Sequence, residues 1–288
     1  MITHDDPLAG FDAHGERYEI VAVRHGRLVT ERSRIYLNYD EYREADGPIT
    51  LFYYFWVIRN ATRTIVVDTG FSRQGAEARR REVLIPVPDA LAELGITEDS
   101  AADVVLTHLH YDHAGNLALF PHQRIIMSRA EYEFWSSDES QRVQLRSVVD
   151  EDDVTELRRA TDEARVYLVS GVTELAPGVR AIEIGGHTPG QLVVLVATAA
   201  GPVLLASDAT HFTEELDRDM PFKHNTDLRA TYRGLDLMRA WRERGEVAHI
   251  IPGHEPSTFE LFPRLRGALS EHAVVIGYPG ATEDSGPR

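Results

Sequence analysis

The sequence contains no cysteine. Disulfide bonds and thiolate metal ligands are therefore excluded, and so is catalysis by a cysteine nucleophile. Any bound metal would have to be held by imidazole and carboxylate groups, and the 13 histidines supply many imidazoles.

Long apolar runs and positive charge are also scarce. No stretch approaches the roughly 20 apolar residues of a membrane span, and the opening MITHDDPLAG lacks the basic and apolar regions of a signal peptide. We therefore expect a cytoplasmic protein without membrane contacts. A net charge of −16 argues against nucleic acid as a partner. We expect a small-molecule substrate, and a homodimer is possible. The one basic block, Arg79 to Arg81, is interpreted as a solvated helix face.

Length and an apolar content of 43% predict one globular domain over residues 1–288. We expect a helical insertion at about 128–165, opened by a capping Ser128, and a disordered tail at about 279–288. Strands and helices mix in both halves, which predicts two mixed β layers with helices outside. The predicted strands are 18–23, 34–39, 51–58, 64–68, 103–106, 124–128, 166–169, 179–184, 191–197, 202–207 and 248–253. The predicted helices outside the insertion are 88–94, 227–244 and 262–272, and the insertion includes a helix at 152–164.

Five places share one property, because a His or Asp comes directly after a predicted strand. Loops at strand ends are where rigid scaffolds hold catalytic groups. These places are Asp68, the loop His108-Leu109-His110-Tyr111-Asp112-His113, His187 in GGHTPGQ, Asp208 in LLASDAT and His254 in IIPGHEP.

The histidine loop carries most of the signal for a metal site. A single histidine at a strand end is usually structural, and the pattern HxH arises often by chance. Four coordinating side chains within HxHxDH cannot lie on one face of a strand, so they need a loop that points them at two centres. The motifs HTPG, SDA and PGHE follow in order. Such a set of imidazoles and carboxylates suits zinc, and also iron, cobalt or manganese.

In these motifs and their order, the sequence resembles the metallo-β-lactamase superfamily. The resemblance runs through VVDTG (66–70), THLHYDHAG (107–115), GGHTPGQ (185–191), ASDA (206–209) and PGHE (252–255). It implies an αββα sandwich of two mixed sheets, with Asp68 orienting the histidine loop. It implies two divalent ions, the first held by His108, His110 and His187, the second by Asp112, His113 and His254, and both bridged by Asp208.

Two ions at such a centre would lower the pKa of bound water toward ~7 and so supply a hydroxide nucleophile at neutral pH. Asp112 or Asp208 could then pass a proton to the leaving group. The chemistry predicted from these residues is therefore hydrolysis.

Within the superfamily, the closest resemblance is to the N-acyl homoserine lactonases, which implies opening of a lactone ring. One position departs from that group: His211 stands where those enzymes usually carry a tyrosine that contacts the substrate carbonyl. We predict that His211 donates this hydrogen bond, with Tyr53, Tyr132 and His224 as other candidates.

The substrate pocket and the reaction class have alternatives. Tyr132, Phe134 and Trp135 either form the wall of an acyl pocket or serve only in packing. A thioester hydrolase resembling glyoxalase II is the second interpretation, and hydrolysis of another cyclic ester or amide is a third. The glyoxalase II group usually carries a C-terminal helical domain with basic residues, and the chain after His254 has only Arg264, Arg266 and Arg288.

Overall fold

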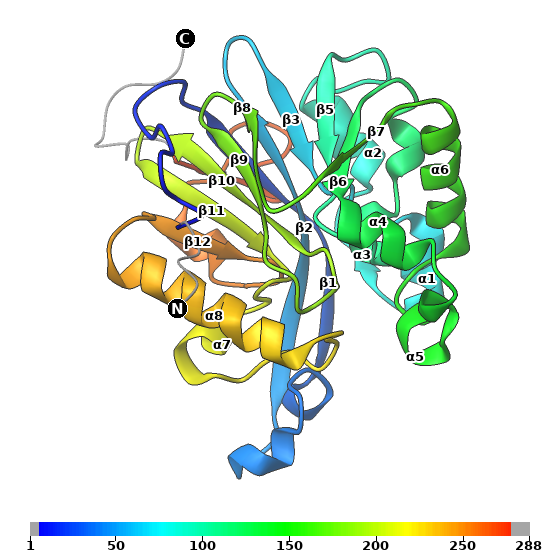
Figure 1. Ribbon diagram of the computed structural model, residues 1–288, viewed down its shortest axis with the longest axis vertical. Coiled ribbons are helices and arrows are strands. Elements are labelled where there is room, and N and C mark those ends of the chain that lie inside the picture. The colour runs from blue at the N-terminus through cyan, green and yellow to red at the C-terminus, as the bar shows by residue number, and fades with distance from the viewer. Residues whose placement is uncertain (1–5, 278–288) are drawn as a thin grey trace.

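The computed structural model describes residues 6–277. These residues form two β-sheets packed face to face, with helices on both outer faces (Figure 1). The predicted αββα sandwich is therefore confirmed. The tail predicted at about 279–288 lies outside the described residues. Within them, no helix combines the length and the apolar character needed to cross a membrane.

The larger sheet of the described range has eight strands in the order β13-β1-β2-β3-β5-β6-β7, with β4 paired to β1. Pairing is antiparallel from β13 to β3 and parallel from β3 to β7. Its strands are β1 (Glu19–Glu31), β2 (Pro48–Arg59), β3 (Thr64–Val67), β4 (Glu82–Val83), β5 (Ala102–Val105), β6 (Ile125–Ser128), β7 (Val166–Val169) and β13 (Ala273–Ile276).

The smaller sheet has five strands among residues 6–277, in the order β12-β11-β10-β9-β8. Only β11 and β12 run parallel within it. Its strands are β8 (Val172–Ala176), β9 (Val179–Glu183), β10 (Leu192–Thr198), β11 (Gly201–Ser207) and β12 (His249–Pro252).

The two sheets share a core because side chains alternate along each strand. In β1, Ile20 and Ala22 face the other sheet, whereas Val21 and Val23 face the helices. The same alternation divides Val194 of β10 from its neighbour Val193. Strands buried on both faces explain why these sequences appear as continuous apolar runs.

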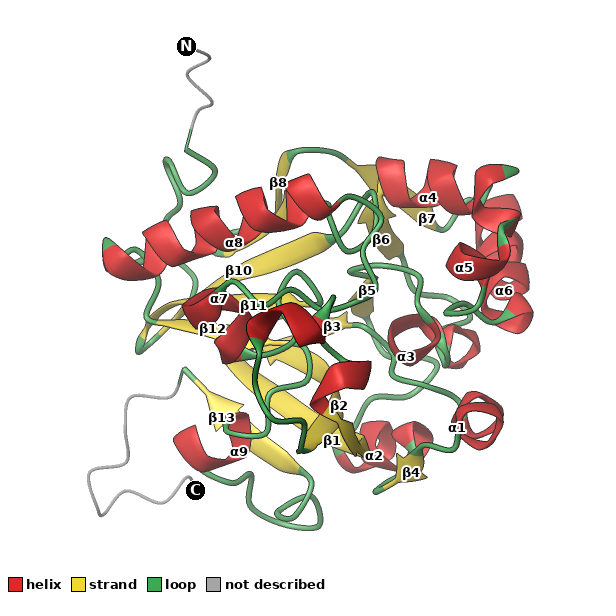
Figure 2. Cartoon of the chain, turned by 90° about the horizontal axis from the view of Figure 1, so that it is seen from below, coloured by secondary structure: helices red, strands yellow, loops and turns green. Residues whose placement is uncertain are grey.

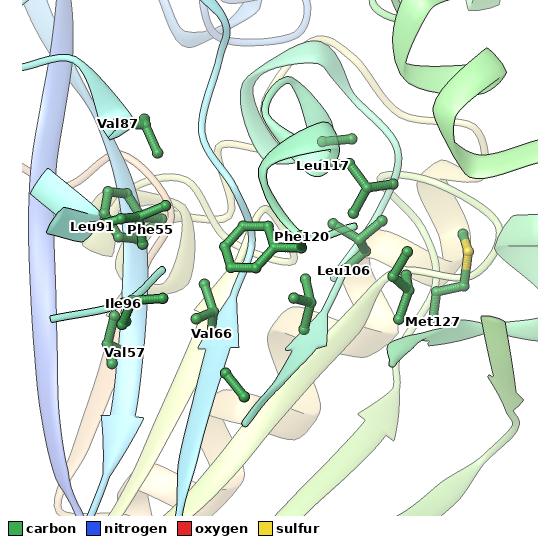
Figure 3. Packing of buried hydrophobic residues seen from close by; sticks show 14 of the residues in the cluster. Phe55, Val57, Val66, Val87, Leu91, Ile96, Leu106, Leu117, Phe120 and Met127 are labelled. Carbon is green, nitrogen blue, oxygen red and sulfur yellow. The ribbon is translucent and has the colours of Figure 1, made fainter. Parts of the chain in front are cut away.

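Helices cover the outer face of the larger sheet. Leu91 of a helix and Phe120 of a loop pack against Phe55 and Val66 of the strands (Figure 3). The helical elements on this side are α1 (Arg73–Arg79), α2 (Val87–Glu93), α3 (Tyr111–Ala114), η3 (Leu117–Leu119), α4 (Arg129–Trp135), η4 (Glu139–Gln141), α5 (Val143–Arg146) and α6 (Glu151–Asp162).

The remaining helices are α7 (Thr213–Arg218), α8 (Leu228–Glu243) and α9 (Thr258–Leu261), and α7 and α8 cover the smaller sheet (Figure 2). The prediction of a helix at 227–244 is confirmed by α8. Asp227 caps it by accepting a hydrogen bond from the Ala230 amide at 3.0 Å. Leu235, Met238 and Trp241 are fully buried. Their spacing of three residues places them on one face of the helix.

The strand predicted at 34–39 is wrong. This segment is the tip of the long β1–β2 hairpin and consists of the short turns η1 (Arg32–Arg34) and η2 (Tyr39–Tyr42). Asn38 between them has a left-handed φ of 48°, which a strand does not accommodate. The β-branched and aromatic residues of this segment resemble a strand in composition, but Tyr36 and Tyr39 pack into a separate cluster with Phe212 and Phe222.

The helix predicted at 262–272 is also wrong, and the strand β13 that follows it was not predicted. Gly267, in the middle of the segment, has a left-handed φ of 95°, and the chain runs through turns instead of a helix. Tertiary contacts decide this segment, since Leu265 and Phe262 pack against the two cores. β13 gains its ladder from β1, a distant partner that local patterns do not reveal.

Candidate metal centre

Each of the five predicted places follows the end of a strand within four residues, and together they lie at one edge of the two sheets. Asp68 follows β3, the histidine loop follows β5, His187 follows β9, Asp208 follows β11 and His254 follows β12. Two turning residues have left-handed backbone conformations, Asp68 with φ of 61° and Ser207 with φ of 46°. Such strained residues are typical of functional sites, where they aim side chains out of a strand.

The predicted ligands gather in two groups. All seven residues are buried, and within each group the candidate ligand atoms lie within 4.8 Å of one another. The first group is His108, His110, His187 and Asp208, and the second is Asp112, His113 and His254.

Asp208 lies between the two groups. One carboxylate oxygen is 3.4 Å from His187 Nε2, and the other is 3.4 Å from His113 Nε2 and 3.3 Å from His254 Nε2. Gly253 makes this approach feasible, because a side chain there would collide with the Asp208 carboxylate. A carboxylate in this position reaches both groups, as a bridging ligand requires.

Hydrogen bonds on the far side of the rings fix the orientation of three histidines. His187 Nδ1 donates to the His224 carbonyl at 2.7 Å, and His254 Nδ1 donates to the Phe52 carbonyl at 2.8 Å. His113 Nδ1 lies 2.8 Å from the Asp68 carboxylate. Such contacts direct the other ring nitrogen at the metal and strengthen it as a ligand.

Asp68 makes the hydrogen bonds expected of an orienting residue. Besides His113, its carboxylate accepts bonds from the amide and the hydroxyl of Thr107, both at 2.8 Å. Since Thr107 precedes the histidine loop, Asp68 ties the end of β3 to the start of that loop.

Glu131 of α4 is fully buried and joins two ligand loops, a role that the sequence did not predict. Its carboxylate accepts from the Leu109 amide at 3.0 Å, the Gly190 amide at 3.1 Å and Trp135 Nε1 at 2.6 Å. Leu109 lies between His108 and His110, and Gly190 follows His187. The SRAEYEFW segment gave no signal for this role, because only the folded chain brings it beside both loops.

The electrostatics of the first ligand group suit a metal ion. Burial lowers the pKa of His108, His110 and His187 well below the ordinary value, so these rings are neutral, which is the form that binds metal. Burial would raise the pKa of Asp208, but the surrounding histidines, His211 first, hold it well below its usual range.

Orphaned polar atoms test whether the residues fit metal ions. His108 Nε2, His113 Nε2 and one Asp208 oxygen are buried and make no hydrogen bond. Buried polar atoms almost always have partners, and these three atoms belong to the two candidate ligand groups. Divalent ions would satisfy them, so the donor set fits the predicted cofactor.

His211 lies beside Asp208 and His254, and these three residues form a further possible ligand group. His211 Nε2 is 3.1 Å from the Asp208 carboxylate, and its ring stacks on Phe222 with centroids 3.7 Å apart. The side chain is buried and does not line the cavity described next. The hydrogen bond from His211 to a substrate carbonyl therefore stays a prediction that the cavity lining does not support.

A cavity of about 390 Å³ opens onto both ligand groups. Of the candidate hydrogen-bond donors, Tyr53 and His224 line it, and Tyr132 does not. A smaller neighbouring cavity of about 140 Å³ is lined by His110 and Trp135. Tyr132 and Phe134 instead pack against the core, so only Trp135 of the predicted aromatic wall faces a cavity.

The interpretation of Arg79 to Arg81 as a solvated helix face is wrong. All three residues line the main cavity. Arg79 ends α1, and Arg80 takes a left-handed φ of 55° that turns the chain, so the three do not continue along one helix face. The run itself was visible in the sequence, but the turn that brings it to the cavity was not.

Comparison with known proteins decides the family. The family model described as the Metallo-beta-lactamase superfamily matches residues 50–260. The chain belongs to the metallo-β-lactamase superfamily. The match contains Asp68 and all seven candidate ligands.

Relatives within the superfamily include lactonases. The chain is 30% identical over 137 residues to an N-acyl homoserine lactonase of a Bacillus species, a match over 47% of this chain and 49% of the relative. The chain thus spans about half the length of the curated relatives that it matches first.

Two solved structures share the metallo-β-lactamase fold at lower identity. One is a quorum-quenching N-acyl homoserine lactone lactonase, with a TM-score of 0.67, 21% identity, and coverage of 84% of this chain and 95% of that one. The other is AidC, a dizinc quorum-quenching lactonase, with a TM-score of 0.66, 17% identity, and coverage of 83% and 88%.

Proposed function

We propose that this protein is a metal-dependent hydrolase that opens a lactone ring with two divalent ions, preferably zinc. The observation that carries the proposal is the pair of buried ligand groups around Asp208, which face one cavity. The lactonases among its relatives support the choice of lactone over other substrates of the superfamily.

Ions bound here would activate water and polarise the ester carbonyl. The residues of the chain then have separate tasks. Asp112 and Asp208 line the cavity, where a carboxylate can carry the proton of the attacking water to the leaving oxygen. Asp68 and Glu131 act through the ligands, because they hold the loops that carry them.

We assign the hydrogen bond to the substrate carbonyl to Tyr53. Its ring lies 5.1 Å from that of His254, and its hydroxyl lies 3.4 Å from the hydroxyl of Tyr111, which also lines the cavity. His211 serves as a positioning residue instead, since its ring contacts the Asp208 carboxylate and lies outside the cavity lining.

Two variants distinguish these roles. Tyr53→Phe should lower kcat by about 10² to 10³ and leave the metal content unchanged, because one donor to the developing oxyanion is lost. His211→Ala should lower the metal content or affinity as well as the rate, because Asp208 loses its support. Elemental analysis and lactone kinetics on both variants provide the readouts.

The opposite pattern would reverse the assignment. If His211→Ala keeps its metal and loses kcat, while Tyr53→Phe hydrolyses lactone at the wild-type rate, His211 reaches the substrate after all.

A substrate panel tests the proposed function itself. Zinc-loaded protein would be assayed with N-hexanoyl homoserine lactone, a simple γ-lactone, a thioester, a β-lactam and a cyclic amide. We expect the highest kcat/KM on a lactone. A preference for the thioester would instead favour the alternative resembling glyoxalase II, and a protein inactive on all five would refute the proposal.

A further inference from the structure

The main cavity is basic although the chain is acidic. The chain carries 46 acidic residues against 30 basic ones. Apart from Asp112 and Asp208, which belong to the ligand groups, the cavity is lined by no acidic residue of the described range. Its other charged residues are all basic, namely Arg34, Arg79, Arg80, Arg81 and Lys223.

Four of these five cations have no carboxylate partner. Arg79 forms a salt bridge with Asp150 at 2.6 Å, but Arg34, Arg80, Arg81 and Lys223 form none with any acidic residue between 6 and 277. Elsewhere on the surface, arginines are commonly paired, for example with Asp103, Glu214 and Glu19. The four unpaired cations around one cavity give it a local positive charge that an anion from outside the chain can balance.

Lys223 is the only lysine in the sequence, and the backbone fixes it beside Arg34. Its amide donates to the Ile35 carbonyl at 2.8 Å, and the Leu37 amide donates to the Pro221 carbonyl at 2.9 Å. These bonds join the tip of the β1–β2 hairpin to the segment before α8. Burial lowers the pKa of Lys223, and repulsion by Arg34 and Arg81 lowers it further, so the three cations oppose one another.

Arg81 is already oriented before any ligand binds. Its Nε donates to the Tyr111 hydroxyl at 2.9 Å, and its Nη1 donates to the Arg79 carbonyl at 2.9 Å. Nη2 makes no hydrogen bond to another described residue and remains available for a ligand. A guanidinium fixed in this way loses little conformational freedom when it binds a carboxylate or phosphate oxygen.

The ligand groups do not explain these cations as counter-charges. Two divalent ions contribute +4, and Asp112 and Asp208 contribute −2, so the loaded centre would carry +2 without any help. Unpaired cations beside such a centre add to its positive potential and attract anions to the cavity.

We propose that the substrate is an anionic lactone, whose carboxylate or phosphate group binds Arg34, Arg81 and Lys223 while its ring lies at the ligand groups. This inference rests on the proposed lactonase function and specifies its substrate class. The negative group balances a cluster that otherwise has no anion, and it distinguishes this cavity from one built for a purely apolar acyl chain.

Three matched substrates test the inference. N-hexanoyl homoserine lactone is neutral, N-adipoyl homoserine lactone has a carboxylate at the end of a chain of equal length, and a third lactone ends in a phosphonate. The wild-type protein should prefer an anionic lactone by about tenfold or more in kcat/KM, as expected for a hydrogen bond to a charged group. The order of the two anionic lactones identifies carboxylate or phosphate as the natural group.

Variants attribute the preference to the cluster. Lys223→Glu should reduce the ratio of kcat/KM between anionic and neutral lactones to about one or below, with the metal content unchanged. Arg81→Gln should reduce the ratio less. Arg158→Glu is the matched control, because it makes the same change of charge on the exposed face of α6, outside the cavity, and should keep the wild-type ratio.

Failure of the inference differs from failure of the proposed function. If all three lactones are hydrolysed equally well and Lys223→Glu does not change their ratio, the inference is wrong and the lactonase proposal stands. If no lactone is hydrolysed, calorimetric binding of ring-opened N-adipoyl and N-hexanoyl homoserine decides the inference. Tighter binding of the former that Lys223→Glu abolishes would support it, and equal binding would overturn it.

Discussion

Replacing Asp208 with alanine should reduce the bound metal from about two ions per chain to one or fewer. It should also lower the kcat for lactone hydrolysis. The expected decrease exceeds the factor of about 10² to 10³ that the loss of one transition-state donor causes. The reason is geometric, since among residues 6–277 only Asp208 has a carboxylate within 3.4 Å of His187, His113 and His254. Elemental analysis and kcat/KM measured on the same preparation give the two results.

A surface aspartate provides the control for this substitution. Asp217 of α7 is half-exposed and pairs with Arg242, away from the ligand groups. Asp217→Ala should therefore keep both the metal content and the rate. Wild-type metal content and activity in Asp208→Ala would show that the carboxylate does not bridge the two groups.

Replacing Glu131 with alanine should destabilise the fold and weaken metal binding together. The substitution leaves the amides of Leu109 and Gly190 and the Trp135 indole buried without an acceptor. At about 1 to 3 kcal/mol for each unsatisfied donor, the free energy of unfolding should fall by roughly 3 kcal/mol or more. Metal affinity should fall about 10- to 100-fold, because two ligand loops lose their common anchor. Thermal unfolding and zinc titration measure the two effects.

Two further variants show whether Glu131 acts as an acceptor. Glu131→Gln keeps one acceptor oxygen and should recover part of both losses. Glu133→Ala, two residues along the same helix, removes an exposed carboxylate and should change neither property. If Glu131→Ala is less stable but still binds zinc with wild-type affinity, Glu131 stabilises the fold without positioning the ligands.

The strands and helices that were predicted correctly are those whose sequences carry strong local patterns. Buried strands such as β3, β5 and β11 are short apolar runs followed within three residues by a His or Asp, so the strand and the site residue after it follow from one pattern. The helix α8 follows from Leu235, Met238 and Trp241, which recur at helical spacing and are buried in the structure.

The errors arise where partners distant in sequence decide the outcome. Residues 34–39 have the composition of a strand, but Tyr36 packs against Phe212 rather than into a sheet. Glu131 and Arg81 resemble ordinary charged helix residues until the fold places one between two ligand loops and the other at the cavity. Local propensity carries no information on such long-range contacts.

The most direct test of the central claim is a zinc titration of metal-stripped protein, with lactone hydrolysis and bound zinc measured at each step. The protein should be inactive on N-hexanoyl and N-adipoyl homoserine lactone after chelation, and should recover its activity as zinc approaches about two ions per chain. Lactone hydrolysis that survives complete removal of metal, or that zinc binding does not restore, would contradict the account.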